Sequence, residues 1–388
     1  MRVLFTTWAW PSHLYALVPL AWACRAAGHE VLVAGQPGLL GDIAASGLPG
    51  AAVGTDVDAV GMVRGYLLPT DPGNASATAP GRGPRAMEMF LAHAESMTGD
   101  LLDLARRWRP DLVVHEPTAL AGPLAAAALG VPSVRVLYGT DLMRRAAAVL
   151  PGALAPLAER YGAKDPDPYG TVTVDPVPTA LQIPHEQEHL AVRHVPYNGP
   201  GALPAPPPEP RRRPRICVTW GHTIAKLDRD RFLAGRVARA VAGLGADVVL
   251  AVSTPQLPLT GPLPDGVRVV TDTPLHHLLG TCDLVVAHGG AGTVLAAAAH
   301  GLPQLLIPQL PDHAGHAGRV VAAGAGEVLT PGEATPERIR AEAERLLADG
   351  PERAAARALR DETHSRPAPA HLVPRLEQLA VTAARDAA

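Results

Sequence analysis

An apolar, strand-like segment runs from Leu284 to His288, and a run of glycines follows its terminal histidine. Gly289, Gly290, Gly292 and Thr293 lead from this segment into a helix-prone stretch. Glycines at a strand-to-helix turn let an anion approach the backbone, and a helix N-terminus supplies free N–H groups and the positive end of the helix dipole. Thr293 adds a hydroxyl group and His288 a ring N–H group. The pattern predicts a cradle for a diphosphate, and a tight turn without a ligand is the plainer alternative.

A second polar pair follows the apolar stretch Gln304 to Pro308. Asp312 and His313 stand side by side there in a proline-punctuated loop. A carboxylate beside a second polar side chain suits the hydroxyl groups of a sugar. Together with His316 the pair also has the ligand types of a metal site, but the neighbouring phosphate cradle explains the polar groups better.

These residues belong to a layout that occurs twice in the chain. A strand, a loop, a helix ending at a glycine and another strand occupy residues 2–35, with the helix expected at 16–27, and the same order returns in residues 215–252, with the helix expected at 228–244. Two such units, about two hundred residues apart, predict two parallel α/β domains with Rossmann-like sheets. Further strands are expected at 111–116, 131–138, 267–270, 284–288 and 304–308, helix from Pro336 onward, and a long surface loop at 53–85.

A proline-rich stretch separates the two units and reads as an extended linker. We therefore expect a first domain at 1–198, a linker at 199–214 and a second domain at 215–388, with a terminal helix that packs back on the first domain. The length of 388 residues agrees with two cores.

Composition excludes several classes of protein. The net charge of -3 argues against a nucleic-acid binder, which would present a basic face. Pro11, Ser12 and His13 interrupt the apolar start, so it does not read as a signal peptide, and no apolar run is long enough to span a bilayer. The three scattered cysteines read as reduced thiols. We expect a cytoplasmic protein without stable membrane insertion.

The chain as a whole resembles GT-B fold glycosyltransferases of the actinomycete natural-product type, which use dTDP- or UDP-sugars to decorate polyketide, enediyne or macrolide aglycones. The resemblance covers nearly the full length and rests on the His-Gly-Gly run and on the following segments: Met1 to Phe5, Ala26 to Val31, Trp108 to Val114, Gly130 to Pro132, Val195 to Gly199 and Thr273 to Leu279. It implies two Rossmann-like domains facing a cleft, a nucleotide-sugar donor and a hydrophobic acceptor, and it leaves a homodimer open.

The resemblance also implies roles for single residues. His13 matches the base that deprotonates the acceptor, and its place after the first strand suits that chemistry. Glu116 matches the carboxylate that orients the base, with an ordinary polar strand end as the alternative. Asp141 is a second candidate, because some C-glycosylating relatives use an aspartate in this region. Trp8 and Trp10 either line the acceptor pocket or pack against the adjacent helix.

The donor half departs from the pattern in two places. His313 stands where relatives have glutamine, and Asp272 stands where many have a tryptophan near the nucleobase. Trp220 is a candidate replacement for that stacking side chain. Thr223, in the loop after its strand, is a further candidate contact to the diphosphate.

The combined prediction is an inverting transferase in antibiotic biosynthesis that makes a direct displacement and needs no essential metal, because the helix terminus stabilises the leaving group. The string Asp165-Pro166-Asp167 is a metal-binding rival of Asp-x-Asp type, with a solvated loop as the plainer reading. A C-glycosyltransferase for an aromatic polyketide is the alternative reaction. A sugar-nucleotide 2-epimerase and a non-catalytic helper protein are the alternatives on the same scaffold.

Overall fold

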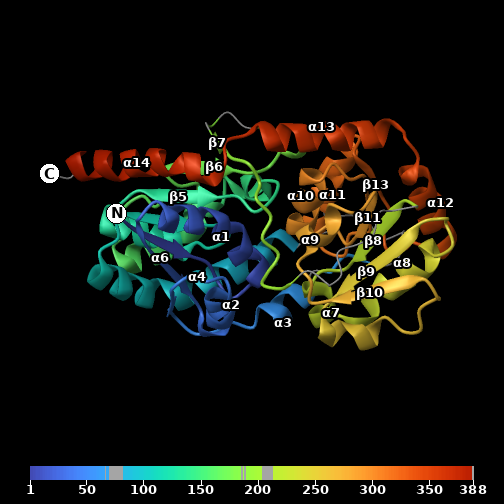
Figure 1. Cartoon of the computed structure of the whole chain (residues 1–388). Helices are drawn as coiled ribbons and strands as arrows, with labels where there is room; N and C mark the ends of the chain where they lie inside the picture. The colour runs from blue at the N-terminus through green and yellow to red at the C-terminus, as the bar shows by residue number, and fades with distance from the viewer. Residues whose placement is uncertain (66, 70–81, 185–186, 188, 203–212, 387–388) are drawn as a thin grey trace.

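The computed structural model describes all residues except 66, 70–81, 185–186, 188, 203–212 and 387–388. The chain forms two α/β lobes side by side (Figure 1). Every strand pairing within the two sheets is parallel. The predicted pair of parallel α/β domains is therefore confirmed.

The first sheet has the order β3-β2-β1-β4-β5-β6-β7. Its strands are rich in buried valine and leucine, as expected for strands covered on both faces. Their bounds are β1 (Arg2–Thr6), β2 (Glu30–Gly35), β3 (Gly50–Ala52), β4 (Leu112–His115), β5 (Ser133–Val136), β6 (Val172–Asp175) and β7 (His189–Ala191). The strand order reverses between β1 and β4, which is where ligands bind to open sheets of this kind.

The second sheet repeats this order as β10-β9-β8-β11-β12-β13. Its bounds are β8 (Arg215–Thr219), β9 (Asp247–Val252), β10 (Val267–Thr271), β11 (Leu284–Ala287), β12 (Gln304–Leu306) and β13 (Gly326–Val328). Here the order reverses between β8 and β11, directly before the His-Gly-Gly run. His13 and Glu116 in the first domain, and His288 in the second, therefore follow strands at a reversal point.

Helices cover both sheets. In the first domain they are α1 (Pro11–Ala26), α2 (Leu40–Ala45), α3 (Ala59–Arg64), α4 (Arg82–Trp108), α5 (Ala121–Leu129) and α6 (Leu150–Tyr161). The later ones are α7 (Thr223–Leu227), α8 (Ala234–Val241), α9 (Leu275–Leu279), α10 (Ala291–Ala299), α11 (Pro311–Ala322), α12 (Pro336–Leu347), α13 (Pro351–Ser365) and α14 (Val373–Asp386).

Three predicted elements differ from the structure. Helix α1 begins at Pro11 rather than Ala16, because proline suits the first helical position. The expected helix over 228–244 is interrupted: the Asp228 side chain accepts a hydrogen bond from the Asp230 N–H, which closes a short turn before α8 begins. The predicted loop 53–85 contains helix α3, capped by the Asp58 side chain. Part of that loop lies outside the described residues.

Hydrogen bonds join the two domains, and the C-terminal part of the chain runs from the second domain back to the first. The Arg64 side chain donates to the Leu227 carbonyl at 2.9 Å, and the Thr179 N–H donates to Glu362 at 2.7 Å. After α13, the chain returns to the first domain, where α14 lies in Figure 1. Leu376 packs in the same hydrophobic cluster as Phe5 and Val18 of that domain.

Candidate active site

His13 and Glu116 meet at the carboxyl ends of β1 and β4. Glu116 follows β4 directly, and His13 is the third residue of α1, so it lies in the first helical turn and not in a loop. Nδ1 of His13 lies 3.3 Å from a carboxylate oxygen of Glu116. The Glu116 side chain is 0% exposed and that of His13 is 13% exposed. The sequence placed both residues at this edge, and the structure brings them into contact.

The Glu116 carboxylate is held in its charged form. Burial by itself would raise its pKa, but the neighbouring His13 and the hydrogen bonds from Thr118 outweigh burial and lower the pKa of Glu116 below its ordinary value. The Thr118 N–H donates to this carboxylate at 2.7 Å. An ionised carboxylate beside Nδ1 can orient an imidazole ring and stabilise the imidazolium that forms on proton uptake.

Thr118 is a site residue that the sequence analysis missed. Its hydroxyl oxygen lies 2.9 and 2.8 Å from the two oxygens of Glu116 and 3.2 Å from Nδ1 of His13. Trp8 donates its indole N–H to the same hydroxyl oxygen at 2.9 Å. One signal was available in the sequence: Thr118 is a polar residue two positions after Glu116, just beyond the predicted strand 111–116.

Aromatic rings surround His13. Tyr138 stacks on its imidazole ring with centroids 4.3 Å apart, and Trp8 meets it edge-on at 5.0 Å. Trp8 is 2% exposed and packs in the core, while Trp10 is half-buried beside it with ring centroids 5.2 Å apart. Of the two tryptophans, Trp10 is therefore the one with surface to offer an acceptor.

The predicted phosphate cradle has the expected local form. His288 follows β11, and Gly290 precedes the first residue of α10. Gly289 has a φ of +89°, a conformation that favours glycine, and a side chain on Gly290 would come within 2.6 Å of Nε2 of His288. The first N–H groups of α10, those of Ala291 and Gly292, precede the first helical acceptor bond and lie next in sequence to the histidine turn, while the Thr293 N–H donates to the Gly290 carbonyl at 3.1 Å. Thr293 is in the first turn of α10.

The second polar pair lies against this cradle. The rings of His288 and His313 meet edge to face at 4.7 Å. Burial lowers the pKa of His313. Burial, together with the neighbouring His313 and His222, lowers the pKa of His288 well below its ordinary value. Both rings are therefore neutral at pH 7. His313 is buried, while Asp312 is 48% exposed at the side chain. Within the part of the chain that is described, no group of three or more His, Cys, Asp or Glu residues is placed to hold a metal ion.

The base and the cradle are neighbours across the domain boundary. Tyr138, which stacks on His13, precedes Gly139. A side chain on Gly139 would come within 2.7 Å of Cβ of Ala291, the first residue of α10, and within 2.8 Å of the His316 ring. Glycine at 139 therefore allows the two domains to approach at the point where base and helix terminus face each other.

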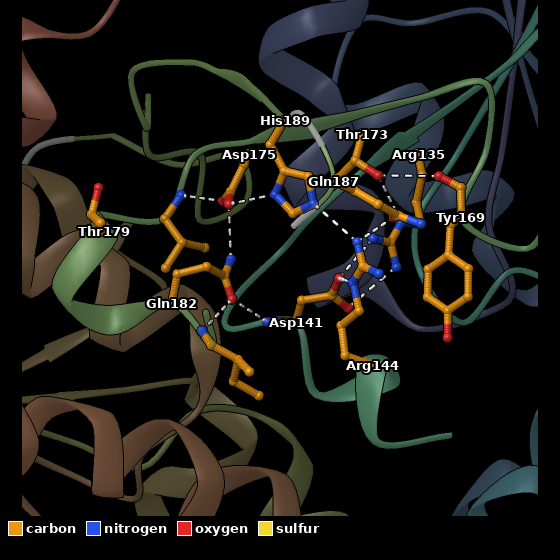
Figure 2. Close-up of polar contacts among 12 residues, drawn as sticks. Arg135, Asp141, Arg144, Tyr169, Thr173, Asp175, Thr179, Gln182, Gln187 and His189 are labelled. Atoms are coloured by element: carbon orange, nitrogen blue, oxygen red, sulfur yellow. Dashed lines mark hydrogen bonds and ion pairs between the residues drawn. The ribbon is translucent and has the colours of Figure 1, made fainter. Parts of the chain in front are cut away.

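Asp141 occupies a different setting from the one proposed for it. Figure 2 shows Arg135 and Arg144 converging on its carboxylate. Arg135 donates to both oxygens, at 3.2 and 2.6 Å, and the Asp141 side chain is 1% exposed. Gln182 accepts from the Asp141 N–H at 2.8 Å and donates to Asp175. With both oxygens engaged by guanidinium groups, Asp141 reads as the centre of a buried network rather than as a base.

Three other predicted donor residues have structural surroundings of their own. Trp220 is 0% exposed and donates its indole N–H to the Arg231 carbonyl, so it is a core residue and offers no stacking surface for a base. Asp272 accepts from the Thr254 N–H at 3.1 Å, which ties together the loops after β9 and β10. Thr223 begins the short helix α7 rather than lying in a loop, and it stays a candidate contact to the diphosphate.

The comparisons with known proteins identify the family of the chain. Two family models match, erythromycin biosynthesis protein CIII-like N-terminal domain over residues 22–221 and C-terminal domain over residues 235–379. The chain is 37% identical to 10-deoxymethynolide desosaminyltransferase of Streptomyces venezuelae, over 98% of this chain and 97% of the relative.

Solved structures give the same result. The chain is similar to glycosyltransferase VinC in complex with dTDP, with 36% identity, a TM-score of 0.81 and coverage of 98% of this chain and 100% of the other. It is similar to spinosyn rhamnosyltransferase SpnG complexed with spinosyn aglycone, with 31% identity, a TM-score of 0.84 and coverage of 97% and 100%. This chain belongs to the erythromycin biosynthesis protein CIII-like family of glycosyltransferases and has their GT-B fold.

Proposed function

We propose that the enzyme transfers a deoxysugar from a thymidine diphosphate sugar to a hydroxyl group of a hydrophobic macrolide or polyketide aglycone, with inversion at the anomeric carbon. The observation that carries the proposal is the buried contact of His13 with Glu116, next to the N-terminus of α10. A relative solved with dTDP and another solved with an aglycone support the two substrate classes.

The reaction divides between the two domains. Nε2 of His13 takes the proton of the acceptor hydroxyl while Glu116 stabilises the ring from Nδ1. The hydroxyl oxygen forms a bond to the anomeric carbon as the bond from that carbon to the diphosphate breaks. The departing charge is met by the backbone N–H groups of α10, with His288 and Thr293 beside them. Asp312 and His313 are proposed to contact the sugar.

Transfer to oxygen is favoured over transfer to carbon by the state of Asp141. Its carboxylate is buried and shared by Arg135 and Arg144, which makes it a poor second base. The base on this structure is a histidine supported by a carboxylate, which suits proton removal from a hydroxyl group.

A substrate screen tests the proposal. Purified enzyme is incubated with a panel of dTDP- and UDP-sugars and of macrolide and aromatic polyketide aglycones, and products are detected by mass spectrometry. We expect one aglycone to gain a single sugar mass from a dTDP-deoxysugar, with inverted anomeric configuration by NMR. His13→Ala enzyme is the matched control. Retention of configuration, or donor hydrolysis without acceptor modification across the panel, would contradict the proposal.

A further inference from the structure

We propose that Trp8 and Thr118 are positioning residues that act in series on the base. Trp8 holds the Thr118 hydroxyl, which in turn holds the Glu116 carboxylate toward Nδ1 of His13 and leaves Nε2 for the acceptor. This role rests on the proposed function of His13 as the base. It concerns residues that contact the reacting atoms only through others.

The bonding capacity of the Thr118 hydroxyl sets the direction of every bond. A hydroxyl group has one hydrogen and two lone pairs. The indole N–H of Trp8 can only donate, so it takes one lone pair at 2.9 Å. The ionised Glu116 can only accept, so the hydroxyl hydrogen goes to its oxygens, which lie 2.8 and 2.9 Å away. Both partners are buried, where loss of a hydrogen bond to a charged group is costly.

The same count of donors and acceptors around the Thr118 hydroxyl fixes the tautomer of His13. Nδ1 faces an oxygen of Glu116 at 3.3 Å and the Thr118 oxygen at 3.2 Å. With the hydroxyl hydrogen committed to the carboxylate, both of these oxygens present lone pairs to Nδ1. Nδ1 must therefore carry the proton, and Nε2 has the lone pair that a general base needs.

Trp8 is itself held from the opposite side. Its ring stacks against His93 with centroids 4.3 Å apart, and Nδ1 of His93 lies 2.9 Å from Oε1 of Gln36. That oxygen also accepts from the Ala9 N–H at 3.0 Å, while Nε2 of Gln36 donates to the Thr55 carbonyl. Because Oε1 only accepts, His93 donates from Nδ1. The segment between β1 and α1 is thereby pinned, and the indole N–H is aimed at Thr118.

A double-mutant cycle tests the series arrangement. Thr118→Val removes the hydroxyl, and Trp8→Phe removes the N–H while keeping an aromatic ring. We expect each variant to lower kcat about tenfold with little change in the KM for the donor. Because Trp8 acts through the hydroxyl, Trp8→Phe should cost little in the Thr118→Val background. Thr118→Ser, which keeps the hydroxyl, should restore most of the rate.

A second readout needs no turnover. The Thr118 oxygen is one of the two acceptors that face Nδ1 of His13. Ring nitrogen chemical shifts of His13, measured by NMR in the full chain, should therefore show a smaller share of the Nδ1–H tautomer in Thr118→Val and a restored share in Thr118→Ser. Thr363→Val is the matched control, since it removes a buried hydroxyl of α13 in the other domain; it should leave the rate and the tautomer share of His13 unchanged.

The outcomes separate the two claims. An equal cost of Trp8→Phe in both backgrounds would overturn the series arrangement, because Trp8 would then act by packing alone. An unchanged tautomer share of His13 in Thr118→Val would overturn the role of the hydroxyl. If the parent enzyme transfers no sugar to any acceptor, the proposed function fails, and the tautomer measurement alone decides whether Thr118 positions His13.

Discussion

A fully buried carboxylate is stable as an anion only when its oxygens are satisfied, and Glu116 meets this condition almost entirely within a short stretch of chain. Thr118 supplies both its N–H and its hydroxyl group, and Thr7 and His13 supply the further contacts. The proposed chemistry uses one atom of this group, Nε2 of His13, because Nδ1 faces Glu116. The proposal therefore depends on a single ring nitrogen.

At the residue scale, replacing His13 by alanine should lower turnover by on the order of 10²-fold or more, because no other general base contacts the same carboxylate in the described residues. Nucleotide affinity should stay nearly unchanged, since His13 belongs to the acceptor domain. Steady-state kinetics and calorimetry with thymidine diphosphate measure the two effects. Transfer at the parental rate in this variant would remove His13 from the mechanism.

The family resemblance pointed to His13 and Glu116, and residues after parallel strands gather at one sheet edge. The sequence did not point to Thr118, because the value of that residue lies in the direction of its hydroxyl, which only the folded backbone defines. The ion pairs of Asp141 were not predictable for a related reason. Its partners Arg135 and Arg144 come from a strand and from a short 3-10 helix, and sequence patterns carry no information about ion pairs between such elements.

At the element scale, the N-terminus of α10 should govern donor affinity. We expect His288→Ala and Thr293→Val to weaken binding of thymidine diphosphate, because each removes a polar group at the turn that faces the diphosphate. His300→Ala, at the other end of the same helix, is the matched control and should bind normally. Equal affinity by calorimetry in all three variants would refute the cradle.

The same helix terminus predicts that activity survives chelation. If backbone N–H groups stabilise the leaving diphosphate, excess EDTA should leave the rate within about twofold, which is less than 0.5 kcal/mol of barrier. The rival string Asp165-Pro166-Asp167 lies in an irregular segment, where Asp165 and Asp167 are exposed. Activity lost with EDTA and restored by Mg²⁺ or Mn²⁺ would show that a cation is required.

Strands were easier to predict than helices in this chain. Runs such as Val248 to Val252 are continuous and apolar, so burial on both faces is legible in the sequence. The helix expected over 228–244 was wrong at its start, because a side-chain-to-backbone bond at Asp228 competes with helix formation there. Helix α6 was missed although Pro151 stands in its first turn and Gly162 follows its end in the left-handed conformation.

At the scale of the whole molecule, buried neutral histidines should make the fold acid-sensitive. Burial lowers the pKa of His93, His115, His194 and His316 to about 4. Unfolding returns each ring to its ordinary value of about 6.5. Between these values the unfolded chain binds more protons, so stability is fully present above about pH 6.5 and falls as the pH drops toward about 4.

Each such histidine should remove roughly 1.4 kcal/mol of unfolding free energy per pH unit within that window. Urea unfolding at several pH values, read from the midpoint at constant slope, measures the loss. A midpoint that is the same at pH 7 and pH 5 would show that these rings are accessible to protons in the folded state. Far-ultraviolet circular dichroism at each pH checks that the starting state is native.

The return of the chain to its first domain has a consequence for synthesis. Leu372, Val373 and Leu376 complete the hydrophobic cluster around β1 and α1, and Glu377 lies 3.0 Å from His29 at the start of β2. The domain that carries His13 is made before the second domain, yet part of its core is encoded after that second domain. Cotranslational folding can therefore build its sheet early, but the apolar surface that receives α14 stays uncovered until the second domain and α14 have been made.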